Sequence, residues 1–456
     1  MSEILESRRS STALFLVILL LGLFLHLFRI SDPDHVVFDE VHFGRFVNAY
    51  LGSHAYYFDV HPPHGKLLIA GVAALGGYEG DQSFARIHEP YEQVRPWLMR
   101  IVPALSGVAI PLLGFAILLQ LGGSPWAAFL AGWMLVLDNG LLIQTRIIAL
   151  DGFMVASILA ACSAGLRGVG RPPSIRRVLW ICASGVCAGA AVGIKWTGLA
   201  GIGFLGLLLI ADLLRRRDLA ALRRFGMDAG LITACATAVY LAGWALHFSW
   251  LDQPGPGDVW GERSGRFFSD FVQVHATMWS ANSGLGQGHP YSSAWWSWPL
   301  MLRPVSYWSS GSHHLYFLGN PVVWWGSTIG LFALLSVTLL VRVTDLRLED
   351  RPVWPDGLWL LVAGYLGAYV PLAFVTRVLF LYHYLMPLVF AVCALALWLD
   401  HLAWTRRGSW REQRASYWAA LMLVLAGFVL GSPFTLSYVE ASAYQAEVFR
   451  WFRGWV

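Results

Sequence analysis

The stretch HVVFDEVHFGRFVNAY, residues 35–50, follows an apolar run at 11–30 that is long enough to cross a membrane. Apolar residues then recur with a helical period, at Phe43, Phe46, Val47, Tyr50 and Leu51. This pattern predicts an amphipathic helix lying along the outer membrane surface, with Asp39 and Glu40 at its N-cap and first turn. Acids are favoured at helix N-termini, but two adjacent carboxylates beside an apolar region also indicate a functional site, and the stretch alone leaves both readings open.

The composition is that of an integral membrane protein. Of the 456 residues, 57% are hydrophobic and 13% are charged, whereas a soluble domain has about 25% charged residues. The net charge of +4 is too small to indicate nucleic-acid binding, and no basic run alternates with aromatic residues. The five cysteines all lie in apolar runs, so we expect them to be small core residues.

Apolar segments near the bilayer length of roughly 20 residues predict about eleven transmembrane helices. They lie at 11–30, 98–120, 125–143, 147–166, 178–192, 194–214, 229–250, 322–341, 357–375, 381–399 and 417–433. The first is predicted to be an uncleaved anchor, because it exceeds the about 7–15 apolar residues of a signal peptide. The expected fold class is therefore all-α and polytopic, with a membrane domain over 1–433 and a tail over 434–456.

The basic residues predict the orientation. Five short segments on one side contain 18 of the 32 Lys and Arg residues, as expected for the cytoplasmic face. These segments are Arg8 and Arg9, then 167–177, 215–224, Arg342 to Arg351, and Arg406 to Arg414. The N-terminus is then cytoplasmic, and an odd number of spans places the C-terminal tail outside.

Two long loops, loop one at 31–97 and loop four at 251–320, fall on the predicted outer face. Long loops on a membrane scaffold usually contribute to function. Tryptophans are concentrated around the second loop, and we expect them to form a belt at the level of the lipid headgroups. They are Trp295, Trp296, Trp298, Trp308, Trp324 and Trp325.

Polar residues recur at the outer ends of the predicted helices, where apolar residues would be less costly. Loop one contains YFDVHPPHGKLLIAG (57–71), and the further residues are Arg100, Asp138, Asn139, Arg146, Asp151, Lys195, Arg377 and His383. Such residues are usually functional or paired. Simpler readings remain open, because Lys66 could extend to the interface and Arg146 could pair with Asp151. Paired acids, scattered cations and an apolar wall suit a lipid phosphate donor and an acceptor from the aqueous side.

Seven segments in order resemble the signature segments of the protein O-mannosyltransferase family. They are FDEVHFGRFVNAY, YFDVHPPHGKLLIA, LDNGLLIQTRIIALDG, GIKWTGL, HPYSSAWWSWPL, YFLGNPVVWWG and FLYHYLMP, between residues 38 and 387. The resemblance implies the eleven-span arrangement called GT-C. It also implies transfer of mannose, with inversion, from a polyprenyl-phosphate-mannose donor to Ser or Thr of secreted or membrane proteins.

The resemblance also implies roles for individual residues. Asp39 is the expected catalytic base, Glu40 its partner in holding the acceptor, and Arg100 a ligand of the donor phosphate. Lys66 or Arg146 would assist Arg100, since a phosphate leaving group requires charge neutralisation rather than the second acid of a glycoside hydrolase. The matching segments also contain further candidate substrate-binding residues, namely His61, Asp151, His289, Asn320 and His383.

Two features depart from the family pattern. Position 64 is His, where the family usually has an apolar residue; this histidine either alters the donor-side wall or is a solvated loop residue. Eukaryotic members carry a large β-rich domain in loop four, which a loop of about 70 residues cannot contain. The chain therefore resembles the compact bacterial form, in which acceptor selection depends on the membrane core and short loops.

The expected partners are the lipid donor, Ser/Thr-containing protein acceptors, membrane lipid and the protein-export machinery, and the expected location is the cell membrane with an extracytoplasmic site. No cofactor is certain; whether Mg²⁺ or Mn²⁺ takes part stays open, since Asp39, Glu40 and histidines could bind one. A related transferase acting on a lipid or glycan acceptor is the alternative function. A transporter is disfavoured, because the polar residues gather at one surface and no internal repeat is found.

Overall fold

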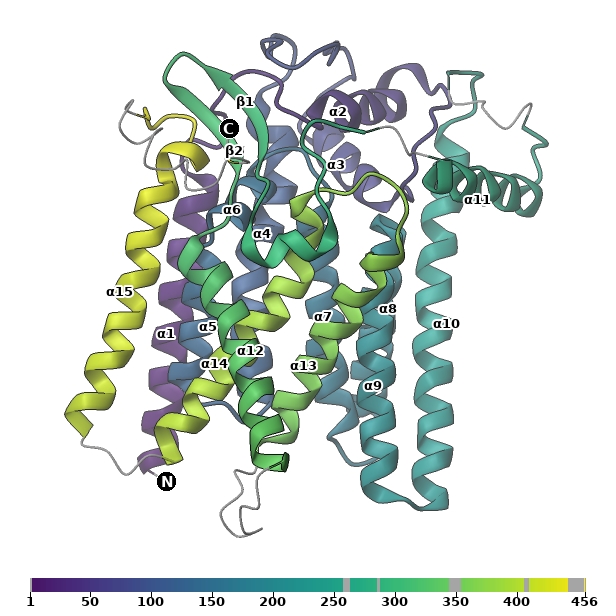
Figure 1. The fold of residues 1–456 in the computed structure, drawn as a ribbon. Helices are drawn as coiled ribbons and strands as arrows, with labels where there is room; N and C mark the ends of the chain where they lie inside the picture. Colours follow the sequence, from purple (N-terminus) through teal and green to yellow (C-terminus); the bar gives the residue numbers. More distant parts are fainter. Residues whose placement is uncertain are drawn as a thin grey trace.

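The computed structural model describes residues 2–256, 263–284, 288–343, 354–405, 410–441 and 455. This part of the chain is a bundle of long helices with shorter elements gathered at its upper end (Figure 1). The helices of the bundle are α1 (Ser2–Leu27), α4 (Pro96–Gln120), α5 (Pro125–Val136), α7 (Asp151–Val169), α8 (Ile175–Ile194), α9 (Leu199–Arg216), α10 (Leu219–Trp250), α12 (Pro321–Val343), α13 (Asp356–Tyr369), α14 (Leu385–Thr405) and α15 (Trp410–Thr435). The short helix α6 (Asn139–Arg146) follows α5.

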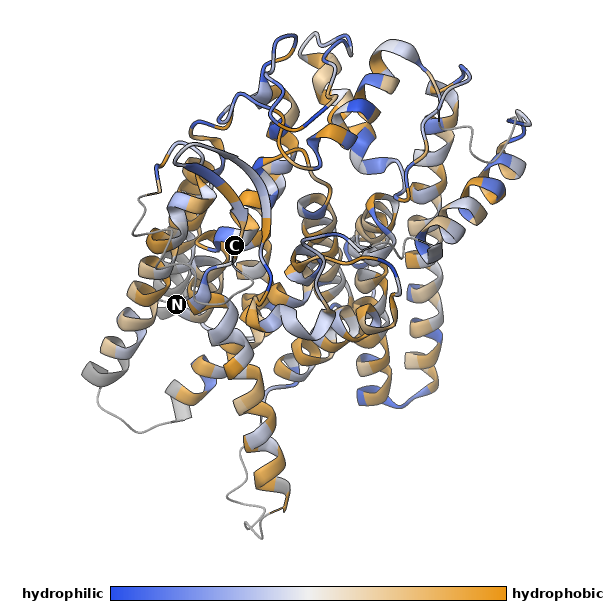
Figure 2. Ribbon diagram, turned by 45° about the horizontal axis from the view of Figure 1, so that its top comes forward, coloured by the Kyte–Doolittle hydropathy of each residue, from blue (hydrophilic) through white to orange (hydrophobic). Residues whose placement is uncertain are grey.

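The helical membrane fold is confirmed, and the number of spans is close to the prediction. Within the described ranges, nine helices are long and apolar enough to cross a membrane, or ten if the bent pair α5 and α6 is one span. The remaining predicted span, 11–30, coincides with α1, whose described apolar part, Ser11–Leu27, has 17 residues. The long helices are hydrophobic along most of their length, as expected for surfaces that face lipid (Figure 2).

The predicted span at 125–143 is broken. Its two helices, α5 and α6, meet at 58°. At the break Asp138 is extended, and its carboxylate accepts a hydrogen bond from the backbone N–H of Leu141 at 2.8 Å, which caps the new helix. Because α6 ends at Arg146 and an extended segment follows, the next span begins at Asp151 and not at 147.

The two long loops meet at the upper end of the bundle (Figure 1). Loop one contains α2 (Glu40–Asn48) and α3 (His64–Leu75), and loop four contains α11 (Phe267–Gly284) and a hairpin of β1 (Val305–Ser310) and β2 (His313–Phe317). The strands are antiparallel, with Val305 opposite Phe317 and an irregularity between Ser306 and Trp308. In the described part of loop four this hairpin is the only sheet.

Helix α2 confirms the predicted amphipathic helix but not its surroundings. Phe43 and Val47 on its apolar face are buried within the protein. Gly44 lies directly against the ring of Phe84, which a Cβ atom at that position would approach to 2.4 Å. The helix therefore packs on the rest of loop one instead of resting its apolar face on lipid.

The predicted tryptophan belt is wrong for three of its six members. Trp298, Trp308 and Trp324 are buried in the protein core. Two of them have hydrogen-bond partners within the protein, since the indole N–H of Trp324 donates to Asp138 at 2.8 Å and that of Trp298 to Ser293 at 2.9 Å. Trp296 is 60% exposed and remains suited to an interfacial position.

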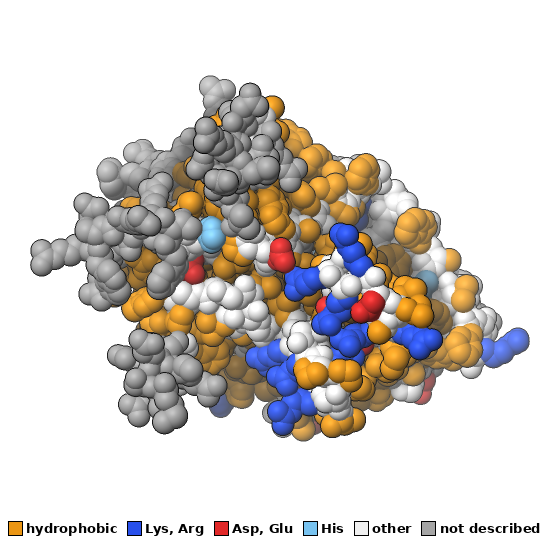
Figure 3. All heavy atoms as spheres, turned by 90° about the horizontal axis from the view of Figure 1, so that it is seen from below, with side chains coloured by type: hydrophobic (Ala, Val, Ile, Leu, Met, Phe, Trp, Pro, Cys, Tyr) orange, Lys and Arg blue, Asp and Glu red, His pale blue; other side chains and the backbone are white. Residues whose placement is uncertain are grey.

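Basic side chains gather at the lower end of the bundle. Seen from below, Lys and Arg side chains gather on one part of the described surface (Figure 3). The α7–α8 and α9–α10 turns and the helix ends beside them carry several of the basic residues. They include Arg167, Arg176, Arg215, Arg216 and Arg217. The side chains of the other three predicted basic segments lie outside the described residues. Helix α1 begins at this lower end, whereas α15 ends at the upper end (Figure 1).

Candidate functional site

Asp39 is the N-cap residue of α2, but its side chain makes no capping hydrogen bond. The half-buried carboxyl has no hydrogen-bond partner among the described residues. Burial raises the pKa of Asp39 to about 7; Lys195 lowers this pKa, and the carboxylates of Asp151 and Asp59 raise it further. A carboxyl group with a pKa near 7 and a free oxygen is suited to accept a proton.

Glu40 has the opposite surroundings, because both of its carboxylate oxygens are fully engaged. Arg100 donates to Oε1 from Nε at 2.8 Å and to Oε2 from Nη2 at 3.0 Å. The other donors are the Tyr91 hydroxyl at 3.0 Å and the backbone N–H groups of Val37 at 2.9 Å and Ile148 at 3.0 Å. Glu40 is 0% exposed, so it has no oxygen left to hold an acceptor. It anchors the start of α2 and thereby the position of Asp39.

Arg100 is equally occupied and fully buried. Its guanidinium also donates to the backbone carbonyls of Ile30, Ser31, Pro33 and His35, at 2.8–3.3 Å. With Glu40, these contacts use all of its N–H groups. The structure therefore leaves Arg100 no free donor for a phosphate, in contrast to the sequence-based expectation, and it organises the segment before α2 instead.

Arg146 and Lys66 are likewise bound within the protein. Arg146 donates to the carbonyls that end α1, those of Leu25, His26, Phe28 and Arg29, where the helix dipole favours a cation. Lys66 forms a buried ion pair with Asp59 and donates to the backbone carbonyl of His61 at 2.8 Å. Asp59, which the sequence-based site did not include, thus helps to hold the His61 segment.

Asp151 pairs with Lys195 instead of with Arg146. The Lys195 ammonium donates to Oδ1 of Asp151 at 2.8 Å, and the amide of Gln144 donates to Oδ2 at 2.8 Å. Asp151 begins α7, whereas Lys195 follows the last residue of α8. Both side chains are more than 90% buried. The open alternative of an Arg146–Asp151 pair is therefore wrong, because Lys195 and Gln144 occupy the two oxygens of the Asp151 carboxylate.

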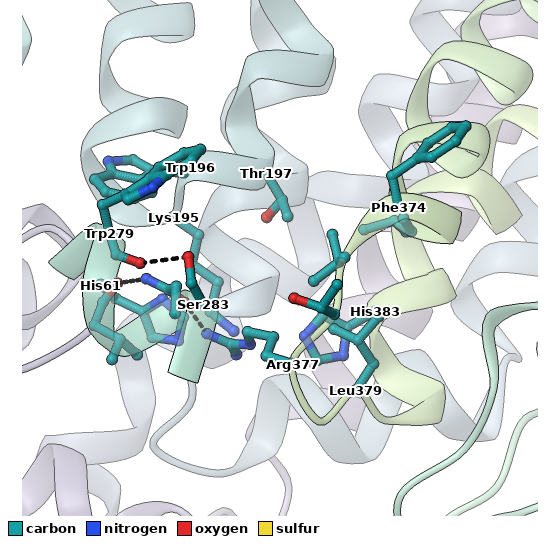
Figure 4. Close-up of a pocket in the computed structure, with 15 residues that line it drawn as sticks. His61, Lys195, Trp196, Thr197, Trp279, Ser283, Phe374, Arg377, Leu379 and His383 are labelled. Atoms are coloured by element: carbon teal, nitrogen blue, oxygen red, sulfur yellow. Dashed lines mark hydrogen bonds between the residues drawn. The ribbon is translucent and has the colours of Figure 1, made fainter. Parts of the chain in front are cut away.

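A cavity of about 320 Å³ opens next to Lys195. Its polar lining consists mainly of His61, Lys195, Asn282, Arg377 and His383, and Figure 4 shows the His61, Lys195, Arg377 and His383 side chains around it. Burial and the nearby cations Lys195 and Arg377 hold the pKa of His61 well below its usual range, so His61 is neutral at pH 7. The cavity therefore presents two basic side chains, Lys195 and Arg377, and two histidines. Apolar lining residues, among them Trp196, Trp279 and Phe374, complete it.

The three remaining candidates lie in different places. His383 lines the cavity. Asn320 is fully buried and bonds the carbonyls of Leu137 and Val424, so it connects helices. His289 is exposed, and its ring lies edge-on to Phe380 with centroids 5.1 Å apart, outside the cavity lining. The sequence marks Lys195 and Arg377 as unusual polar residues at helix ends but indicates no role for them. Their shared cavity becomes visible only in three dimensions.

His64 is not the solvated loop histidine of the simpler prediction. Its Nε2 lies 2.9 Å from the carbonyl of Val239. Its ring occupies a notch between α8 and α10, where a Cβ on Gly193 or Gly243 would meet it at 2.3 or 2.1 Å. It does not line the cavity, so it joins α3 to these helices.

No group of three or more His, Cys, Asp or Glu side chains in the described ranges could hold a metal ion.

Comparison with known proteins identifies the family. The sequence model described as dolichyl-phosphate-mannose-protein mannosyltransferase matches residues 16–253, which is more than half of the chain. The model described as the C-terminal four-transmembrane region of protein O-mannosyltransferase matches residues 267–455. The chain belongs to the protein O-mannosyltransferase family. Both matches lie within the chain in the order expected for a member of this family.

Curated members of the protein O-mannosyltransferase family match about half of the chain. Protein O-mannosyltransferase 1 of Drosophila melanogaster is 34% identical over 239 residues, covering 51% of this chain and 27% of the relative. Protein O-mannosyl-transferase 2 of Danio rerio is 32% identical over 265 residues, covering 55% of this chain and 35% of the relative. The chain thus spans only about a quarter to a third of the length of the curated relatives it matches.

Solved structures show the same fold. The Saccharomyces cerevisiae protein O-mannosyltransferase Pmt1–Pmt2 complex bound to the sugar donor superposes with a TM-score of 0.89 at 20% identity, covering 97% of this chain and 92% of that chain. ArnT from Cupriavidus metallidurans bound to undecaprenyl phosphate gives a TM-score of 0.55 at 18% identity, covering 92% of this chain and 64% of that chain. At these identities the likeness establishes the GT-C fold of this protein O-mannosyltransferase family member.

Proposed function

We propose that this chain transfers mannose from a polyprenyl-phosphate-mannose donor to Ser or Thr hydroxyls of proteins. Family membership supports the reaction class. The observation that carries the proposal is the Asp39 carboxyl, which has a pKa of about 7 and interacts electrostatically with Lys195. Asp39 does not itself line the cavity, but Lys195 does, together with a second cation, Arg377. A base beside an anion-binding cavity is what transfer from a sugar phosphate requires.

The donor phosphate binds between Lys195 and Arg377. Both side chains line the cavity, and each is held by a neutral or acidic partner, Asp151 for Lys195 and Asn282 for Arg377. Asn282 is neutral, so Arg377 brings an uncompensated positive charge to the cavity. The apolar lining suits the isoprenoid chain, since Phe374 is 80% exposed toward the surroundings of the bundle. Lys195 and Arg377 thus replace Arg100, Lys66 and Arg146, the phosphate ligands expected from the sequence.

The chemical step is a single displacement. Asp39 accepts the proton of the Ser or Thr hydroxyl while the hydroxyl oxygen forms a bond to the anomeric carbon. The bond from that carbon to the phosphate oxygen breaks, and its electron pair leaves with the polyprenyl phosphate. Lys195 and Arg377 stabilise the charge that develops on this phosphate, so no second acid is required. Attack opposite the leaving group inverts the configuration.

Glu40, Arg100, Lys66 and Arg146 hold the site in place. Glu40 and Arg100 fix the start of α2, Lys66 fixes the His61 segment through Asp59, and Arg146 fixes the end of α1. The site lies at the end of the bundle opposite the arginine-rich face that Figure 3 shows, and the positive-inside rule supports a location outside the cytoplasm in a multi-pass cell-membrane protein. Acceptors then reach it as they leave the protein-export machinery.

Mass spectrometry of secreted proteins from cells with and without this chain tests the proposal. Single hexoses on Ser or Thr should disappear when the chain is deleted and return with the wild-type copy, but not with Asp39→Asn. Loss of a hexose from a lipid or glycan, with protein hexoses unchanged, would instead support the related lipid-linked transferase. Unchanged hexoses on all these molecules would refute both functions.

A further inference from the structure

Tyr307 lies between the two halves of the proposed site. It belongs to β1 of the loop-four hairpin and is 1% exposed. Its ring stacks on Phe38, with centroids 4.2 Å apart and planes at 13°. Its hydroxyl donates a hydrogen bond to the side-chain oxygen of Gln144 in α6. One residue of loop four therefore makes two different contacts with two segments that carry site residues.

The stacking contact holds the residue directly before the proposed base. Phe38 has a φ of +41°, a conformation that non-glycine residues adopt only when their surroundings hold them there. Tyr307 covers one face of its ring, and Tyr382 meets it edge-on at 6.3 Å. The backbone conformation at Phe38 determines the direction in which the Asp39 side chain points. The stacking contact, which holds Phe38 in this conformation, therefore orients the Asp39 carboxyl group.

The hydrogen-bonding contact leads to the cation of the cavity. Gln144 accepts from Tyr307 with its oxygen and donates from its nitrogen to Oδ2 of Asp151 at 2.8 Å. Asp151 in turn accepts from the Lys195 ammonium at 2.8 Å. Gln144 and Asp151 are both more than 90% buried, so water does not replace a lost partner readily. The orientation of this relay depends on the Tyr307 hydroxyl, which determines which end of the Gln144 amide faces Asp151.

We propose that Tyr307 is a positioning residue that aligns the base with the phosphate-binding cation: its ring orients Asp39 through Phe38, and its hydroxyl orients Lys195 through Gln144 and Asp151. The proposal rests on the proposed function, in which Asp39 and Lys195 act on the same substrate. Tyr307 itself contacts no substrate. Tyr307 lies in the part of the chain matched by the C-terminal family model, whereas Asp39 and Lys195 lie in the part matched by the first model, so it couples loop four to these two residues.

The two contacts can be separated by substitution. Tyr307→Phe keeps the ring and removes the hydroxyl. The Lys195 ammonium then loses its fixed orientation, so the donor KM should rise about tenfold. The acidic limb of the kcat–pH profile should not shift, because the contact with Phe38 remains. The matched control is Tyr316→Phe on β2, since the Tyr316 hydroxyl has no hydrogen-bond partner in the described residues; its kinetics should equal those of the wild type. A Tyr307→Phe enzyme with an unchanged donor KM would overturn the relay.

Phe38→Leu tests the other contact. It removes the stack but not the relay, so kcat should fall about tenfold and its acidic limb should shift, with the donor KM unchanged. Phe38→Tyr, which retains a ring of the same shape, should have the wild-type kcat and the wild-type position of the acidic limb. A Phe38→Leu enzyme that loses only thermal stability, with normal kcat and pH profile, would show that the stack is merely structural and would overturn this half of the proposal.

A double substitution tests whether Tyr307 acts through Gln144. In a Gln144→Leu background the relay is already broken, so adding Tyr307→Phe should change the donor KM less than twofold. A full additional tenfold rise would mean that Tyr307 acts by another route. Failure of the wild-type chain to transfer mannose at all would refute the proposed function, whereas wild-type activity with unaffected variants would refute only the role of Tyr307.

Discussion

Asp39 and Glu40 are adjacent in sequence but have different chemical environments. Successive residues at the start of a helix point about 100° apart. This rotation directs Glu40 toward Arg100, where its charge is compensated, and leaves Asp39 without a hydrogen-bond partner among the described residues. The two readings of the acidic pair, structural anchor and functional site, thus each apply to one residue. Neither carboxylate caps α2 through its side chain in the usual way.

Replacing Asp39 by Asn should separate catalysis from stability. Asn has a similar size but cannot accept the proton, so turnover should fall by roughly 10²–10⁴ while the melting temperature in detergent is unchanged. Because the pKa of Asp39 is raised to about 7 in the free protein, the base form increases with pH, and wild-type kcat/KM should rise with a midpoint near pH 7. Asp34→Asn, a change of an exposed acid in the same loop, is the control. Normal turnover of Asp39→Asn would exclude Asp39 as the base.

Arg100→Ala should act mainly on stability. Removing one partner of this fully buried pair leaves Glu40 charged and uncompensated, which costs about 3–5 kcal/mol. The melting temperature should fall markedly, and Lys should not restore it, because Lys cannot make the forked contact. Arg29→Ala, which breaks the exposed Arg29–Asp32 pair, should have little effect. An Arg100→Ala variant with normal stability and a raised donor KM would instead support Arg100 as a ligand of the donor phosphate.

Arg377→Ala should act mainly on the donor. Loss of a charge-assisted contact of about 1.5–3 kcal/mol should raise the donor KM at least tenfold, with acceptor KM unchanged. Lys should restore part of the affinity, since it retains the charge. Arg86→Ala, at an exposed position in loop one, is the control. Steady-state kinetics at varied donor concentration measure this effect. A general loss of folding would instead change the donor KM and the acceptor KM together, or lower the yield of folded protein.

At the scale of elements, Asp138 joins three helices at the break between α5 and α6. Its carboxylate accepts from the backbone of Leu141 and Asn320 and from the indole of Trp324, all at 2.8–2.9 Å. Asn320 continues the network to Val424 in α15. The network therefore connects helices matched by the two different family models, and these helices position the hairpin that carries Tyr307.

Asp138→Ala should disrupt this connection. Three buried donors would lose their acceptor, at a cost of about 1–3 kcal/mol each, so folding yield and melting temperature should both fall. Asp218→Ala removes a helix cap at an exposed position and should cost only about 1 kcal/mol, which makes it a matched control. Equal melting temperatures of the two variants would contradict a structural role of the Asp138 network.

At the scale of the whole molecule, the charge distribution predicts the orientation in the membrane. A cysteine at Arg217 should resist impermeant thiol reagents in intact cells, whereas one at Asp81, in loop one at the other end, should react. The five native cysteines are buried or half-buried, so the chain without an added cysteine provides the background. Labelling of Arg217→Cys but not Asp81→Cys would place the candidate site on the cytoplasmic side.

The sequence by itself determined the membrane class, most spans, the helix after Asp39 and the family, because these depend on local hydropathy, period and motif order. It also marked the polar residues from which the site is built. Only the tertiary structure decided their partners: Arg100 with Glu40, Lys195 with Asp151, Arg146 with the end of α1, and three tryptophans with the core. The physical reason is that a buried charge is compensated by whichever group folding brings within about 3 Å, and that group is usually far away in the sequence.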